Sequence, residues 1–175
     1  TDLVIDNADI NATDVGVDVV DTGDGATTTL QNSVISYSNN ATDIDVSSLG
    51  GTSTTVEVLD NEFSDGTTGL YIDGDQDVAG LNVHFNQFSS NTNGTVVDTN
   101  FDSGIANVTF NDFVDNENGL EVRGIDGEVN ANYSWWDNRD YSRIVGPYTP
   151  QNAGSQLPSP RRVYSYTRLH TGGQP

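Results

Sequence analysis

The chain of 175 residues contains no cysteine, no methionine and no lysine, and its six basic residues are all arginine. Without cysteine, neither a disulfide framework nor a thiolate zinc site can form. No apolar run approaches the ~20 residues that a transmembrane helix needs, so we expect no membrane span. The segment Thr1–Leu3 and the residues after it do not resemble a signal peptide. We therefore expect a mature chain or a fragment of a longer one.

Acidic residues dominate the charge. The 26 Asp and Glu give a net charge of -20 and an isoelectric point near 4.1, and residues 1–122 contain 22 of these acids and no base. Binding of nucleic acid is disfavoured, because a net anion gains nothing from counterion release. Molar salt shortens the Debye length to ~3 Å and screens the self-repulsion, so the composition suits a protein that works in brine. Intrinsic disorder is the alternative, and the regular apolar positions argue against it.

A repeat of 25 residues is the strongest pattern in the chain. It relates the similar segments Val58–Phe63, Val83–Phe88 and Val108–Phe113. Eight residues after the asparagine of each segment, a glycine opens a strand-like stretch, at Gly69, Gly94 and Gly119. Each repeat contains two or three short alternating stretches and no amphipathic helical window. Such units bury their apolar faces by stacking on one another, which predicts a parallel β-helix.

Stacking places equivalent residues above one another at the strand spacing of ~4.8 Å. One predicted column contains Phe63, Phe88 and Phe113, which we expect to fill the core. A second contains Asn61, Asn86 and Asn111. We expect these asparagines to tolerate a tight turn and to form hydrogen bonds along the coil.

The pattern N-x-F, a polar stretch and then G-L-x-V resembles the right-handed parallel β-helix superfamily, the pectate-lyase-like fold, over roughly residues 3–130. Asn132–Asp137, with Gly146-Pro147 following, resembles the segment that often closes the last coil in secreted haloarchaeal members, although Asp137 stands where that segment usually has glycine. The resemblance implies an all-β, right-handed parallel β-helix of about five coils in a domain of residues 1–146, with a closing segment at 131–146. It implies little about activity, because the superfamily includes lyases, hydrolases, phage tailspikes, adhesins and inert scaffolds.

The two ends of the chain suggest assembly. No capping helix precedes Leu3, so the first coil would expose its apolar end. The tail of residues 147–175 contains Arg161, Arg162 and Arg168, and residues 123–175 carry a net charge of +2. We expect self-assembly, or contact with neighbouring subunits, through the uncapped coil and this tail. Docking of the tail on its own barrel is the alternative.

Asp73, Asp98 and Arg123 directly follow the glycine-led strands and should form a column. In residue type they resemble the sites of pectate-lyase-like enzymes, where acids hold calcium against a uronate and an arginine abstracts the proton. Asp75 and Asp77 are close enough in sequence to join Asp73 as ligands of a hard cation, although the segment lacks the EF-hand pattern. Calcium is therefore an optional ligand, and no cofactor is required.

Paired carboxylates also allow hydrolysis. Asp73 and Asp98 on adjacent coils would lie ~5 Å apart, which suits a retaining glycosidase and not an inverting one. A neighbouring arginine lowers carboxylate pKa values, however, whereas the general acid needs a raised one. The simplest alternative is that Arg123 neutralises two stacked acids on a surface that faces brine.

Other candidate residues are a histidine and several aromatics. His84 should face solvent, opposite Val83 and Phe85, and no Ser-His-Asp spacing supports a nucleophilic role for it. Three aromatic residues could stack against sugar rings, namely Tyr71, Trp135 and Trp136. In the alternative, the two tryptophans plug the open end of the last coil.

Five sequons of the form Asn-x-Ser/Thr occur, at Asn11, Asn40, Asn93, Asn107 and Asn132. The first three fall in predicted turns, so we expect glycosylation of an exported protein. Our leading hypothesis is a non-catalytic extracellular β-helix of a halophile, a structural or adhesive element of a cell-surface filament or a virion. A carbohydrate-active enzyme that uses Asp73, Asp98 and Arg123 and a glycan-binding module are the two alternatives.

Overall fold

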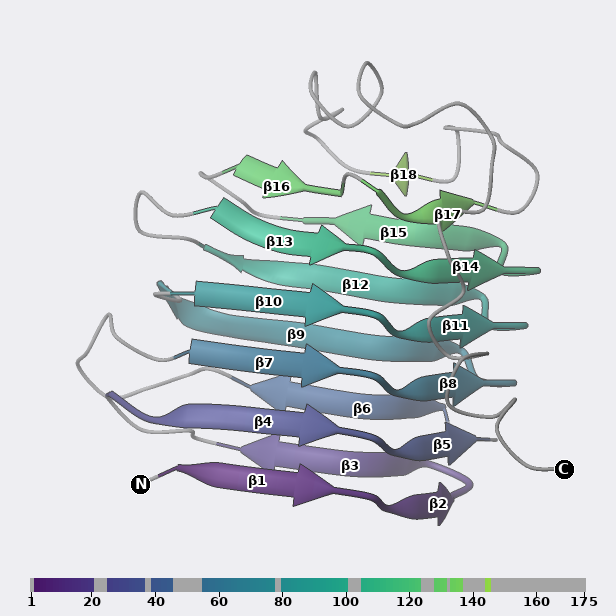
Figure 1. The fold of residues 1–175 in the computed structure, drawn as a ribbon, viewed down its shortest axis with the longest axis horizontal. Coiled ribbons are helices and arrows are strands. Elements are labelled where there is room, and N and C mark those ends of the chain that lie inside the picture. Colours follow the sequence, from purple (N-terminus) through teal and green to yellow (C-terminus); the bar gives the residue numbers. More distant parts are fainter. Residues whose placement is uncertain are drawn as a thin grey trace, which may run out of the picture.

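The computed structural model describes residues 2–20, 25–36, 39–45, 55–77, 80–100, 105–123, 128–131, 133–136 and 144–145. This part of the chain contains 18 strands and no helix. The strands form three parallel sheets of six strands each, stacked as a solenoid (Figure 1). The expected fold class, an all-β parallel β-helix, is confirmed. The tail of residues 147–175, including Arg161, Arg162 and Arg168, lies outside the described residues.

Each circuit of the chain contributes one strand to each sheet. The first sheet contains β1 (Leu3–Asp6), β4 (Thr27–Gln31), β7 (Thr55–Leu59), β10 (Gly80–His84), β13 (Ile105–Thr109) and β16 (Glu128–Asn130). The second contains β2 (Asp9–Asn11), β5 (Val34–Ser36), β8 (Glu62–Ser64), β11 (Gln87–Ser89), β14 (Asp112–Val114) and β17 (Trp135–Trp136). The third contains β3 (Val15–Val20), β6 (Asn40–Asp45), β9 (Thr68–Asp77), β12 (Asn93–Asn100), β15 (Asn118–Val122) and β18 (Ile144–Val145).

The coil is right-handed. In Figure 1 the strands of the first two sheets run from left to right in front, and the fainter strands of the third sheet return behind them while the chain rises from the N-terminus. The pairing of β11 with β14, which places Phe88 beside Phe113, shows that the 25-residue repeat of the sequence is the stacking register of the solenoid. The sequence predicts about five coils, and each sheet contains six strands, of which β16, β17 and β18 follow the clear repeats.

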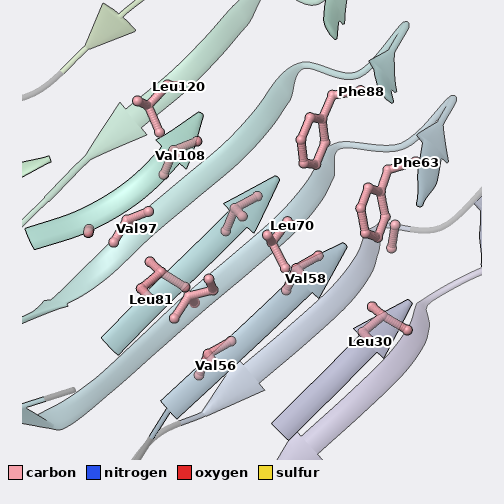
Figure 2. Packing of buried hydrophobic residues seen from close by; sticks show 14 of the residues in the cluster. Leu30, Val56, Val58, Phe63, Leu70, Leu81, Phe88, Val97, Val108 and Leu120 are labelled. Atoms are coloured by element: carbon pink, nitrogen blue, oxygen red, sulfur yellow. The ribbon is translucent and has the colours of Figure 1, made fainter. Parts of the chain in front are cut away.

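The core is a set of columns of like residues. Phe63, Phe88 and Phe113 stack with ring centroids 5.0 and 5.1 Å apart, and Trp136 continues this column at 4.3 Å from Phe113. All four side chains are buried. Figure 2 shows Phe63 and Phe88 in parallel, with aliphatic side chains such as Leu70 in the same interior. The predicted phenylalanine column is therefore present.

A buried asparagine ladder connects the rungs at the corner between the first and second sheets. The Oδ1 atom of Asn86 accepts hydrogen bonds from the backbone N–H and the side chain of Asn61, at 2.9 and 3.0 Å. Asn111 accepts the same two bonds from Asn86, at 3.0 Å each. A second ladder, of Asn91 and Asn116, follows the second sheet and was not predicted from the sequence. The amides satisfy buried backbone groups, so the two ladders connect successive rungs at the corners.

The tight turn at the first corner belongs to the residue before each ladder asparagine. Asp60, Phe85 and Phe110 have φ values of 55°, 60° and 57°. The strand alternation in the sequence predicted that Phe85 points into the core. This prediction is wrong, because the left-handed turn directs Phe85 away from it. Its half-buried ring packs outside the coil against Phe110 in a tilted arrangement, with centroids 5.5 Å apart and an interplanar angle of 34°. Left-handed backbone is uncommon for a bulky residue, so the fold imposes this conformation against local preference.

The glycine of each repeat allows the chain to enter the third sheet beside the aromatic column. A Cβ atom at Gly94 would lie 2.6 Å from the backbone oxygen of Gly119 and 2.8 Å from the Phe113 ring. Any side chain at this position would force the rung and the aromatic column apart. The recurrence of glycine at this position in the sequence is therefore a packing requirement.

Candidate functional site on the outer face of the third sheet

The structure brings the predicted column of Asp73, Asp98 and Arg123 together. Asp73 of β9 is the register partner of Asp98 of β12. The backbone N–H of Arg123, immediately after β15, donates to the carbonyl of Val97 at 2.8 Å. The three residues thus follow one another on successive rungs. The backbone of Asp45 extends the column by one rung below Asp73, which the less regular early repeats did not indicate.

The guanidinium group of Arg123 is bound mainly by Glu121, a residue that the sequence analysis did not single out. Its Nε and Nη2 atoms donate to the two carboxylate oxygens of Glu121 at 2.8 and 2.9 Å. The contact from Nη1 to Asp98 Oδ2 is longer, at 3.9 Å. Alternation along a strand places residues two apart on one face, so the sequence did contain the signal for Glu121. The hydrogen bonds that Arg123 donates to Glu121, together with the negative charges of Glu121 and Asp98, raise the pKa of Arg123.

Tyr71 belongs to the same surface. Its hydroxyl donates to Asp98 Oδ2 at 3.3 Å. Partial burial, together with the negative charges of Asp98 and Asp73, raises the pKa of the Tyr71 hydroxyl. The phenol therefore remains protonated and stabilises the Asp98 carboxylate as a donor.

These contacts define what the site can do chemically. A proton-abstracting arginine must lose its own proton, and a raised pKa together with two charge-assisted hydrogen bonds opposes that loss. Among the described residues, no group of three or more histidine or acidic side chains is arranged to hold a metal ion. The side-chain positions of Asp75 and Asp77 lie outside what the structure describes, so calcium at Asp73, Asp75 and Asp77 stays a prediction.

The two tryptophans occupy different environments. Trp136 is buried at the end of the phenylalanine column, where one face of its indole covers Phe113. This position agrees with the alternative in which a tryptophan plugs the open end of the coil, and it leaves Trp136 no free face for a sugar. Trp135, on the other side of β17, is half-buried. Tyr133, which is 50% exposed, is the more accessible aromatic residue of this region.

His84 lies on the outer face of the first sheet, as the alternation predicted. Its Nδ1 atom is 2.7 Å from the hydroxyl of Thr109 on the next rung. Burial lowers the pKa of His84, so the ring is neutral at pH 7. The charge of Glu57 also acts on the ring, but Glu57 accepts a hydrogen bond from Asn82, and the hydrogen-bond partner of His84 is Thr109.

The sequons differ in their surroundings. The prediction that the first three sequons fall in turns is wrong, because Asn11 ends β2 and Asn40 and Asn93 begin β6 and β12. Asn11 is exposed, whereas Asn40, Asn93 and Asn107 are half-buried. Asn107 belongs to an outer ladder on the first sheet, in which it donates to Asn82 and accepts from Asn130, at 3.2 Å each. Asn132 lies outside the described residues.

In comparisons with known proteins, no family model, curated protein or solved structure matches the chain. The described residues include no helix that is long and apolar enough to cross a membrane.

Proposed function

We propose that the chain is a non-catalytic, extracellular β-helix of a halophile, which acts as a structural or adhesive element of a cell-surface filament or a virion surface. The main support for the proposal is the pair of hydrogen bonds that Arg123 donates to Glu121. The cation that a lyase would use as its base instead holds a neighbouring acid through two short hydrogen bonds. Arg123 therefore acts as a surface clamp along its own strand, with a longer ionic contact of 3.9 Å to Asp98 on the adjacent rung.

The distribution of charge supports a role in brine. Among the side chains whose exposure the structure describes, the buried polar ones are all Ser, Thr or Asn, so no charged side chain of that set lies in the core. Acids such as Asp9, Asp18 and Glu62 are exposed on the outer faces of the coil. An exterior of this kind is compatible with folding when salt screens the repulsion.

A glycan-binding role is the second candidate, and one observation favours it. Phe85, Phe110 and Tyr133 form a row of aromatic rings on the outside of the coil, in which Phe85 is tilted against Phe110 and Tyr133 stacks on Phe110 at 5.0 Å. The half-exposed ring of Tyr133 could stack against a sugar ring. Adhesion to a polysaccharide would then occur without cleavage.

A first test measures product release from a panel of neutral and uronate-containing polysaccharides. The assay uses wild type and Arg123→Ala in molar salt, with and without calcium. We expect no release by either protein, because the arginine remains protonated. Sedimentation in the same buffer should show ordered assembly.

The control for this assay is Glu62→Gln, which removes an exposed acid on the second sheet, away from the column. Release by wild type and by this control that disappears in Arg123→Ala would overturn the scaffold proposal and place an active site on the column. Retention of a polysaccharide without release would favour the glycan-binding role.

A second test concerns salt. We expect the midpoint of thermal unfolding to rise by at least about 3 °C between 0.1 M and 2 M KCl, which corresponds to about 1 kcal/mol for a chain of this size. The reason is screening of the acidic exterior. Sucrose of equal osmolality serves as the control for effects of excluded cosolute. An unfolding midpoint that stays constant or falls with KCl would contradict the brine habitat.

A further inference from the structure

Two threonine hydroxyls in the core have no hydrogen-bond partner. Thr42 of β6 and Thr95 of β12 are both completely buried, and the Oγ1 atom of each forms no hydrogen bond. They occupy one column of the third sheet, in which Leu70 lies between them and Leu120 follows. The repeat therefore places an apolar side chain here, and two rungs depart from it.

Folding gives no reason for these two departures. A buried hydroxyl without a partner loses its hydrogen bonds to water and gains none in return. Valine has nearly the shape of threonine and would fill the same space without that loss. Whatever use the hydroxyls of Thr42 and Thr95 have must arise outside the folded core.

The sequence around both threonines indicates that use. Each is the third residue of a sequon, in Asn40-Ala41-Thr42 and in Asn93-Gly94-Thr95. The equivalent segment of the next rung is Asn118-Gly119-Leu120, which keeps the asparagine and the glycine but has the expected apolar residue. An asparagine at the start of the strand therefore does not by itself require a threonine two residues later.

The other described hydroxyls of buried sequons have a structural use. The Thr109 hydroxyl lies 2.7 Å from His84 Nδ1, and the asparagine of its sequon is held in the outer ladder. Ser134 Oγ donates to the carbonyl of Val108 and accepts from the backbone N–H of Asn111, at 3.2 Å each. Only at Thr42 and Thr95, among the described buried sequons, is the hydroxyl without a role in the fold.

We propose that Asn40 and Asn93 carry N-linked glycans, which are attached before their rungs fold. In the transfer, the side-chain nitrogen forms a bond to the anomeric carbon of an oligosaccharide activated as a glycosyl phosphate. The bond from that carbon to the phosphate oxygen breaks, the phosphate leaves with the electron pair, and the nitrogen loses a proton. The transferring enzyme must contact the sequon hydroxyl, which is inaccessible at Thr42 and Thr95 once the coil has closed.

The fold places the two asparagines near one another, and the Asn93 side chain can accommodate a glycan. Asn40 and Asn93 are the first residues of β6 and β12, which begin at the same end of the third sheet (Figure 1). Both pair with Thr68 of the rung between them. They are therefore two rungs, or ~10 Å, apart. Asn93 accepts a hydrogen bond from Asn118 through its Oδ1 atom, at 3.0 Å. Its side-chain nitrogen donates no hydrogen bond among the described residues, so a glycan can take that position.

Peptide mass spectrometry of the protein purified from its own organism tests the proposal. We expect a glycan mass on the peptides that contain Asn40 and Asn93, and none on the peptide that contains Asn107. In that organism, Thr95→Val should abolish modification of Asn93 and Thr95→Ser should preserve it. Unmodified asparagine at both positions would overturn the proposal, as would a glycan on Asn107 alone.

Unglycosylated protein from a host without N-glycosylation gives an independent measurement. There, Thr95→Val should raise the ratio of folded to unfolded protein by about 5- to 30-fold, because it removes a buried hydroxyl without a partner. Thr109→Val is the matched control and should lower this ratio, since it removes a hydrogen-bond partner of His84. Destabilisation by Thr95→Val would show that the hydroxyl serves the fold and would remove the basis of the inference. The proposal does not depend on the scaffold role, which the polysaccharide assay tests separately.

Discussion

Asn86→Ala is expected to lower the free energy of unfolding by about 3–6 kcal/mol. The side-chain nitrogen of Asn86 donates to the carbonyls of Val58 and His84, at 2.9 and 3.0 Å. Its oxygen accepts from the backbone N–H of Asn61 at 2.9 Å, so the ladder is bonded in both directions. Alanine leaves several buried groups without a partner, and each such group costs about 1–3 kcal/mol. Urea unfolding in 2 M KCl measures the change.

The matched control is Asn82→Ala. Asn82 also belongs to an asparagine ladder, but on the outer face of the first sheet, where it donates to Glu57 at 2.7 Å and accepts from Asn107. It is half-buried, so water can replace the lost bonds, and we expect a loss of less than about 1 kcal/mol. Equal effects of the two substitutions would show that the buried ladder contributes no more to stability than a surface one.

Phe88→Ala is expected to lower the free energy of unfolding by about 3–5 kcal/mol, the usual range for removal of a buried aromatic side chain. Phe88 is fully buried and lies between Phe63 and Phe113, with interplanar angles of 8° and 11°. Alanine would open a cavity in the middle of the column and remove two stacking contacts. The measurement is the same urea titration. A smaller substitution, Phe88→Leu, keeps the site filled and should lose less.

Phe85→Ala controls for the loss of a phenylalanine from the same rung. Phe85 packs in a tilted contact outside the coil, is only half-buried and has a left-handed backbone. We expect a loss of less than about 1.5 kcal/mol, mainly the energy of this aromatic contact. If Phe85→Ala were as destabilising as Phe88→Ala, the outer row of aromatic rings would be part of the structural core, and its availability to a glycan would be in doubt.

Much of the fold could be predicted because each coil of a solenoid repeats the same pattern of buried and exposed residues. The 25-residue period in the sequence is the stacking register, so Phe63, Phe88 and Phe113 could be assigned to one column without a structure. The same register predicted that Asp98 follows Asp73. The prediction was weaker where the repeat is less regular. Asp45 pairs with Asp73 at a spacing three residues longer than the 25-residue repeat, and this pairing was not predicted.

The contacts within the candidate site were less predictable. The repeat shows which residues share a column, but it does not show which neighbouring residue a long side chain will contact. Arg123 has Asp98 on the adjacent rung and Glu121 on its own strand, and it takes the bidentate contact with Glu121. That choice depends on side-chain reach and geometry. Because of this contact, Arg123 is interpreted as a residue that binds a neighbouring acid, and no longer as a catalytic base beside Asp73 and Asp98.

The sequence by itself determined the register of this protein, because a coil that stacks on itself repeats its apolar positions at the length of one circuit. Only the tertiary structure decided which residues leave that pattern. Phe85 turns outward because the corner requires a left-handed residue there, and the hydroxyls of Thr42 and Thr95 lie in the core without partners because the strands around them close the coil. Those outcomes depend on packing between rungs, which local sequence does not encode.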